Sequence, residues 1–137
     1  MLIVGSNPSR ELMSAAGKRK NVEVRTGLST AEIHRLLAEA QINALPTFQS
    51  TGVKLKLLSA LYSGRFCLVN DAMVKGTGLW EYCMVVETPE QWVKGIDQLK
   101  NSAFTASEKE KRQHLLSGPY SNKINAAMLY AFIFPSS

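Results

Sequence analysis

The sequence is poor in the residues that metal and disulfide chemistry require. It has two cysteines and two histidines in 137 residues, and no pair of them has metal-ligand spacing. Both cysteines, Cys67 and Cys83, lie in apolar runs, which favours buried free thiols over a disulfide. We therefore predict no metal site and expect a reducing, cytoplasmic setting.

Long apolar runs are also lacking. The last apolar stretch, Ala126–Phe134, is far shorter than the roughly 20 residues that a membrane span needs. No helical pattern alternates basic and aromatic side chains along one face, so we expect no nucleic-acid partner. Positive charge is present in excess, with a net charge of +5. That charge suits an anionic ligand such as a nucleotide, or a negatively charged membrane surface.

The length predicts one domain, 1–137, and strand and helix patterns alternate along all of it. This alternation is typical of a doubly wound α/β fold with a mostly parallel sheet of about five strands, flanked by helices. The expected strands are Leu2–Gly5, Asn21–Thr26, Ile42–Leu45, Phe66–Val69 and Tyr82–Val86. Helices are expected after Asn7-Pro8, over Val53–Tyr62 and over Ser121–Phe134. Capping boxes that begin at Ser29, Thr88 and Thr105 predict three more, the last over Ser107–Leu116.

The stretch Pro46–Asp71, which forms a βαβ unit together with the preceding strand Ile42–Leu45, carries the clearest functional signal. Its first loop, Gln49–Val53, runs directly into a helix start, where free amide groups and the helix dipole attract anions. Gly52 permits close approach of a ligand to the backbone, and Lys54 and Lys56 add positive charge. The alternative is that Gly52 only serves a turn and that both lysines are solvated. A second small-residue loop, 76–78, is a weaker candidate for ligand binding.

The same unit resembles the carboxyl-terminal domain of the family 4 retaining glycosyltransferases. The shared features are Pro46-Thr47, Thr51-Gly52-Val53-Lys54, Leu57-Leu58-Ser59-Ala60-Leu61, Gly64 and Phe66–Val69. Further matching segments occur in order along nearly the whole chain. The resemblance implies a Rossmann-like three-layer sandwich and an enzyme of two such lobes, with the active site between them. It also implies that this lobe holds a nucleotide-sugar donor and that neither a metal nor another cofactor is required.

The resemblance assigns the donor site to five residues: Thr51, Gly52, Val53, Lys54 and Ser59. The sequence departs from the family pattern at two of them, because Thr51 and Ser59 occupy the positions of the family's paired glutamates. Hydroxyl groups can still form hydrogen bonds there, but they supply no negative charge. The catalytic histidine of such enzymes lies on the other lobe, so no catalytic residue is predicted here.

In the family, a further strand precedes the segment that matches Leu2–Gly5, and it is usually central in the sheet. This strand has no counterpart in the sequence. We therefore expect the chain to be part of a longer glycosyltransferase, and inactive by itself. Two ways to close the gap stay open: direct pairing of strands that the family keeps apart, or strand exchange within a homo-oligomer.

The expected reaction is transfer of a hexosyl group, such as mannosyl, from a nucleotide-sugar to a glycan or lipid-linked acceptor. The resemblance places this chemistry in cell-envelope polysaccharide synthesis, with peripheral contact to the inner membrane face left open. The alternative is a non-catalytic α/β nucleotide-binding or structural module.

Overall fold

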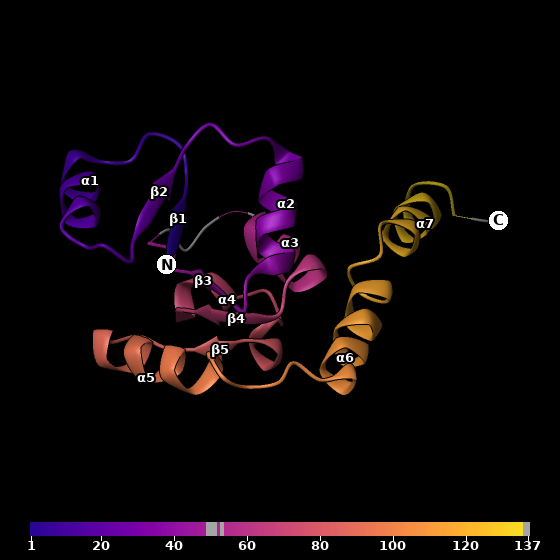
Figure 1. The fold of residues 1–137 in the computed structure, drawn as a ribbon. Coiled ribbons are helices and arrows are strands. Elements are labelled where there is room, and N and C mark those ends of the chain that lie inside the picture. The colour runs from indigo at the N-terminus through magenta and orange to yellow at the C-terminus, as the bar shows by residue number, and fades with distance from the viewer. Residues whose placement is uncertain (49–51, 53, 136–137) are drawn as a thin grey trace.

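The computed structural model describes residues 1–48, 52 and 54–135, and it has the expected α/β architecture (Figure 1). All five strands of the described residues pair in parallel, but they form two sheets. The smaller sheet has the order β1-β2 and the larger one β3-β4-β5. The strands are β1 (Leu2–Val4), β2 (Glu23–Arg25), β3 (Ile42–Leu45), β4 (Phe66–Val69) and β5 (Met84–Val85).

The helices follow the predicted alternation with one addition, a short helix over Asp71–Val74, where the sequence pattern predicts a loop. They are α1 (Arg10–Gly17), α2 (Thr30–Glu39), α3 (Leu55–Ser63), α4 (Asp71–Val74), α5 (Pro89–Leu99), α6 (Ala106–Ser117) and α7 (Asn122–Ile133), with a 3₁₀ turn, η1 (Trp80–Tyr82). Capping boxes begin α2, α5 and α6 at Ser29, Thr88 and Thr105, as the sequence predicts.

The predicted start of the first helix is wrong. Asn7 has a positive φ of 50°, and Ser9 is the N-cap residue instead. The Ser9 hydroxyl accepts a hydrogen bond from Leu12 N at 3.2 Å. The helix therefore begins two residues later than the Asn7-Pro8 pair indicates, because the serine satisfies a free amide of the first turn.

Helices cover both faces of the larger sheet. Alternate residues of β4 point to opposite sides, as the pleat requires. Cys67 and Val69 join the core cluster that includes Leu57 of α3, while Leu68 joins a second cluster with Leu99 of α5. The arrangement of helix, sheet and helix confirms the predicted sandwich for this part of the chain.

The buried core lies almost entirely in the second half of the fold. Among residues 1–40, only Ala16 is buried. Large apolar side chains of the first βαβ unit remain exposed, including Val4, Leu12 and Met13. No strand pair joins β1 to β3 in the described part of the chain, so the direct pairing considered above is not present. Strand exchange between chains stays a prediction.

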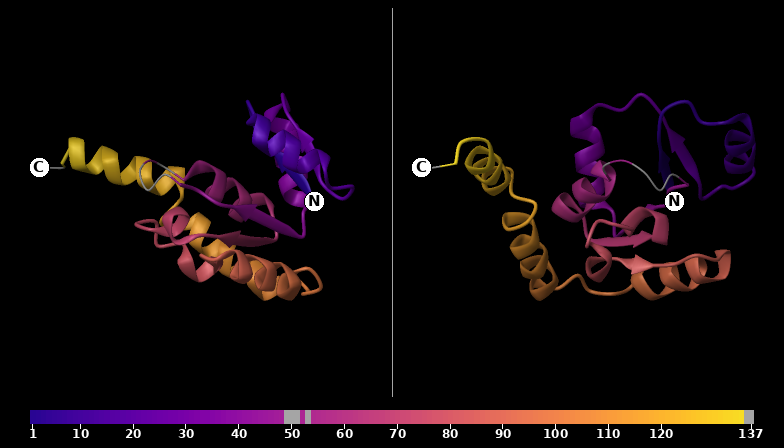
Figure 2. Two further views of the ribbon diagram at one scale, coloured as in Figure 1. Left: turned by 90° about the vertical axis from the view of Figure 1, so that its left-hand side faces the viewer. Right: turned by 180° about the vertical axis from the view of Figure 1, so that it is seen from behind.

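The last two helices leave the body of the fold, and α7 projects furthest (Figures 1 and 2). One contact that anchors α6 is buried Arg112, which donates a hydrogen bond to the carbonyl oxygen of Gly64 at 3.1 Å. Its guanidinium also lies 4.7 Å from the centre of the Phe104 ring. In contrast, α7 buries no residue. Across the described ranges, no helix combines the length and the apolar character needed to span a bilayer.

Candidate functional site

The strands of the larger sheet end side by side, at what we call the carboxyl edge: Pro46-Thr47, Asn70-Asp71 and Glu87. The register pairs Leu45 with Val69 and Val69 with Val85, so these three strand ends are aligned. In open parallel sheets, ligands bind outside this end of the strands. The carboxyl edge is therefore the position at which a ligand site is expected.

Side chains join the loops along this edge. Asn70 Oδ1 accepts a hydrogen bond from Thr47 N at 3.0 Å, and Asn70 Nδ2 donates one to the Thr47 carbonyl oxygen at 2.7 Å. The carboxylate of Glu87 accepts a hydrogen bond from Asp71 N. These contacts fix the ends of β3, β4 and β5 relative to one another.

Positive charge lies at the start of α3. Lys54 is the N-cap residue and is buried, and its carbonyl oxygen accepts hydrogen bonds from Leu57 N and Leu58 N at 3.0 and 3.1 Å. Lys56 Nζ donates to the carbonyl oxygen of Pro46 at 2.9 Å, which brings a second ammonium group to the carboxyl edge.

The two ammonium groups influence each other. Partial burial, and then the charge of Lys54, lower the pKa of Lys56 below its ordinary value of 10.5. A bound anion would relieve this repulsion and the desolvation cost, because an opposite charge favours the protonated amine. The start of α3 is therefore a cationic site at a helix N-terminus.

The predicted donor residues have different environments. Gly52 is exposed, its φ of +87° favours glycine, and a Cβ there would meet nothing within 4 Å. Ser59 is half-buried on α3, one turn after Lys56, so the two share a helix face. Thr51 and Val53 lie outside the described residues. The structure thus brings Gly52 and Lys54 to the start of the helix, with Ser59 further along it.

The sequence interpretation missed three residues of this edge: Asn70, Asp71 and Glu87. Each comes directly after a predicted strand or one residue beyond it, and that position was the available signal. Hydrogen bonds join the three to each other or to Thr47, and these contacts could not be inferred from the sequence.

The loop with the second small-residue motif serves a turn. Gly76 and Gly78 have φ values of 73° and 68°. The Thr77 hydroxyl donates to the Val74 carbonyl oxygen at 2.7 Å and accepts from Leu79 N at 3.1 Å. The hydroxyl group of Tyr120 donates to the Thr77 carbonyl oxygen. These internal contacts explain the conformation of the loop, and no ligand is needed to explain it.

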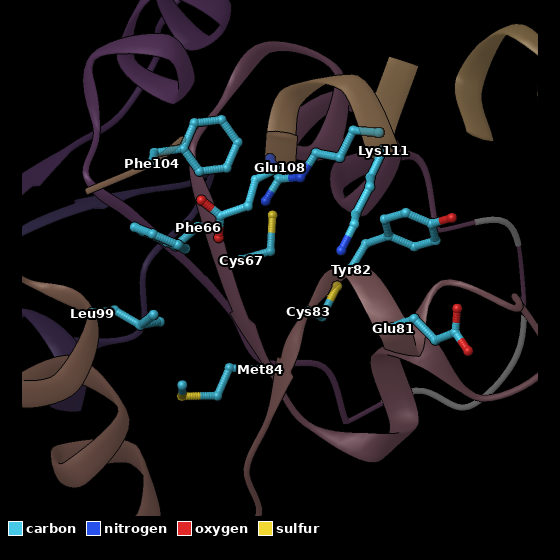
Figure 3. Close-up of a pocket in the computed structure, with 11 residues that line it drawn as sticks. Phe66, Cys67, Glu81, Tyr82, Cys83, Met84, Leu99, Phe104, Glu108 and Lys111 are labelled. Carbon is cyan, nitrogen blue, oxygen red and sulfur yellow. The ribbon is translucent and has the colours of Figure 1, made fainter. Parts of the chain in front are cut away.

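A pocket of about 470 Å³ lies elsewhere, beside the beginnings of β4 and β5 (Figure 3). None of Gly52, Lys54 and Ser59 lines it. Within the part of the chain that the structure describes, no group of three or more histidine, cysteine or acidic side chains could hold a metal ion. The described residues that the sequence predicts to bind the donor therefore lie outside this pocket.

A layered α/β unit with parallel strands belongs to the Rossmann-like class of folds, in which ligands bind at the carboxyl edge of the sheet. Residues 1–102 match the family described as Glycosyl transferases group 1, and the chain belongs to that family. It is therefore a glycosyltransferase domain. The matched range includes both sheets and ends before α6. No curated protein and no solved structure matches the chain.

Proposed function

We propose that the chain is the donor-binding lobe of a retaining glycosyltransferase of family 4, and that a second lobe completes the active site. The enzyme transfers a hexosyl group, such as mannosyl, from a nucleotide-sugar to a glycan or lipid-linked acceptor. The observation that carries this proposal is the pair Lys54 and Lys56 at the start of α3, beside the carboxyl edge. Because the acceptor side and the catalytic histidine belong to the other lobe, the 137-residue chain alone has no transferase activity.

Each side chain has a distinct role in the proposal. Lys54 and Lys56, together with amide groups after Gly52, neutralise the donor diphosphate. The hydroxyl groups of Ser59 and Thr51 bind ribose or sugar hydroxyls, in place of the family's glutamates.

Calorimetric titration of the chain with GDP and UDP tests the proposed site. Lys54→Met is expected to weaken binding by about tenfold or more, because a charge-assisted hydrogen bond to phosphate is lost. Lys94→Met is the matched control, since Lys94 is an exposed lysine of another helix, α5. Circular dichroism checks that both variants keep their fold. Equal affinity of wild type and Lys54→Met would contradict the assignment.

The second candidate is a non-catalytic nucleotide-binding module. The absence of the family's two glutamates at Thr51 and Ser59 favours it. The two candidates differ when the chain is combined with the remainder of its proposed enzyme. Transfer from a nucleotide-sugar that depends on Lys54 supports the enzyme, whereas nucleotide binding without transfer supports the module.

The proposed phosphate contact also predicts a dependence on pH. Because the pKa of Lys56 is lowered, this amine loses its proton at a pH below 10.5. The affinity for ADP, whose groups do not titrate in this range, is expected to fall between pH 8 and about 10.5. The contribution of Lys56 to stability has the opposite sign and rises over the same range, because the unfolded chain binds more protons.

Titrations at pH 8 and pH 10 measure this effect, and Lys56→Gln is the control. The variant is expected to bind ADP more weakly at pH 8 and to lose less affinity at pH 10 than the wild type. A wild-type affinity that stays constant over this range would show that Lys56 does not contact the diphosphate.

A further inference from the structure

Cys67 of β4 lies opposite Cys83, the residue that precedes β5. The register pairs Leu68 with Met84, which places the preceding residues, Cys67 and Cys83, side by side where β5 begins. Neighbouring strands are about 4.8 Å apart, which is within the Cα separation that a disulfide accepts. Both cysteines are free, and both pack against the same core cluster under α3.

The two thiols face one space. Figure 3 shows both sulfur atoms pointing into the pocket of about 470 Å³ beside the beginnings of β4 and β5. The two thiols are close enough for each to shift the pKa of the other. Cys67 is 2% exposed and Cys83 is half-buried, and the pocket that both residues line has room for a small molecule.

The surroundings make the two thiols unequal. The neighbouring thiol of Cys83 lowers the pKa of Cys67, burial opposes this effect, and the charge of the Arg112 guanidinium adds to it. The neighbouring thiol of Cys67 and burial both raise the pKa of Cys83. The other charged groups that line the pocket are Glu81, Glu108 and Lys111. Cys67 is therefore the thiol that ionises first.

We propose that Cys67 and Cys83 form a dithiol modification site, which a small hydroperoxide such as hydrogen peroxide closes into a disulfide between β4 and β5. The Cys67 thiolate attacks one peroxide oxygen, the O–O bond breaks, and the released hydroxide takes a proton to become water. The Cys83 sulfur then attacks the Cys67 sulfenic sulfur, and its proton leaves with the hydroxyl group as a second water. Two thiols are oxidised and one peroxide is reduced.

This site is independent of the proposed donor site. The cysteines lie toward the beginnings of β4 and β5, whereas Lys54, Lys56 and Glu87 lie near the opposite end of the strands. Failure of one proposal therefore leaves the other standing.

Treatment of the intact chain with one equivalent of hydrogen peroxide, followed by mass spectrometry, tests the proposal. The expected product is a monomer lighter by about 2 Da, which is the mass of the two hydrogens lost. Peptide mapping should join the peptides that contain Cys67 and Cys83. A chain of unchanged mass, a disulfide-linked dimer, or oxidation to sulfinic acid in place of the disulfide would overturn the proposal.

Single variants test the unequal roles of the thiols. In Cys83→Ser, no second thiol is present to convert the sulfenic acid at Cys67 into a disulfide. Dimedone should therefore label this sulfenic acid readily. The serine hydroxyl keeps a hydrogen-bond donor at position 83. In Cys67→Ser, Cys83 should react at least about tenfold more slowly, because its own pKa is not lowered. Equal labelling of the two variants under native conditions would contradict the assignment of Cys67 as the attacking thiol. The urea-unfolded variants provide the reference for intrinsic reactivity.

Discussion

Gly64→Ala is expected to lower the free energy of unfolding by about 3 kcal/mol, because the added methyl group has no room. An alanine Cβ would lie 2.3 Å from Asn43 Nδ2, 2.8 Å from the Ala60 carbonyl oxygen and 2.9 Å from the Leu37 carbonyl oxygen. Two of these three atoms belong to the backbone and cannot turn away. The φ of Gly64 is −98°, which any residue adopts, so the cost comes from packing and not from strain.

The displaced amide adds to this cost. Asn43 is buried in β3, and its Nδ2 donates a hydrogen bond to the Leu37 carbonyl oxygen at 3.2 Å. A methyl group on Gly64 pushes this amide from its partner and leaves a buried polar group unsatisfied. Gly64 therefore holds the ends of α2 and α3 against β3, which explains in physical terms the glycine that precedes the strand in the family resemblance.

Gly95→Ala is the matched control. Its Cβ would lie 2.8 Å from Leu68 Cδ1 and 3.1 Å from Met84 Sδ, which are the ends of flexible side chains. Alanine also favours the helix by up to about 1 kcal/mol over glycine. The net loss for this variant should therefore stay below about 1 kcal/mol. Urea unfolding followed by circular dichroism measures both variants, and equal losses would show that the backbone around Gly64 can move aside.

The central βαβ unit could be predicted from the sequence because its signals agree. The bounds of β3 and β4 match the expected runs, Ile42–Leu45 and Phe66–Val69. Each run is apolar, short and limited by proline or by glycine and charge. Capping boxes were equally informative, since a hydroxyl and an acid or amide three residues apart act within a single helical turn.

The start of α1 was missed because two capping signals compete. Asn7-Pro8 and Ser9 both have the side chains of a helix start, and the choice between them depends on the path of the chain from β1. That path places Asn7 in the left-handed region, which asparagine tolerates better than most residues. The path of the chain depends on the whole fold and cannot be inferred from the local sequence.

The candidate site was predictable only in its local part. Gly52 and Lys54 are two residues apart, so one loop places both at the start of α3. The contact between Thr47 and Asn70 instead joins positions 23 residues apart in the sequence. It exists because β3 and β4 are neighbours in the sheet, and the same holds for Asp71 and Glu87 across β4 and β5. Strand order is a property of the whole fold and cannot be read from any single segment.

The division into two sheets could not be predicted for the same reason, since it also depends on strand order. The apolar pattern predicts that Leu2–Val4 and Ile42–Leu45 are strands, but it does not state which edges meet. Among the described strands, β1 pairs only with β2, and β3 pairs only with β4. The backbone groups on their other sides therefore have no ladder partner within the described strands. This arrangement is the physical basis for expecting a further strand from outside the chain.

The uneven core leads to the second large effect. Leu68→Ala is expected to lower the free energy of unfolding by about 3–4 kcal/mol, since this side chain is fully buried in the central strand β4. Leu12→Ala in α1 should cost less than about 1 kcal/mol, because Leu12 remains 36% exposed and Ala16 is the only buried residue near it in the sequence. The same chemical change is thus expected to have very different costs in the first βαβ unit and in the larger sheet.

Urea unfolding measures both leucine variants, and amide hydrogen exchange shows where the difference arises. Amides of β1 and α1 should exchange through local opening, with little dependence on Leu68, whereas those of β3 and β4 should exchange at a rate set by global unfolding. Comparable losses for Leu12→Ala and Leu68→Ala, with uniform protection along the chain, would mean that the first βαβ unit folds as one cooperative body with the larger sheet. A strand that fills the gap between β1 and β3 would have this consequence, because it would bury Val4 and complete both ladders.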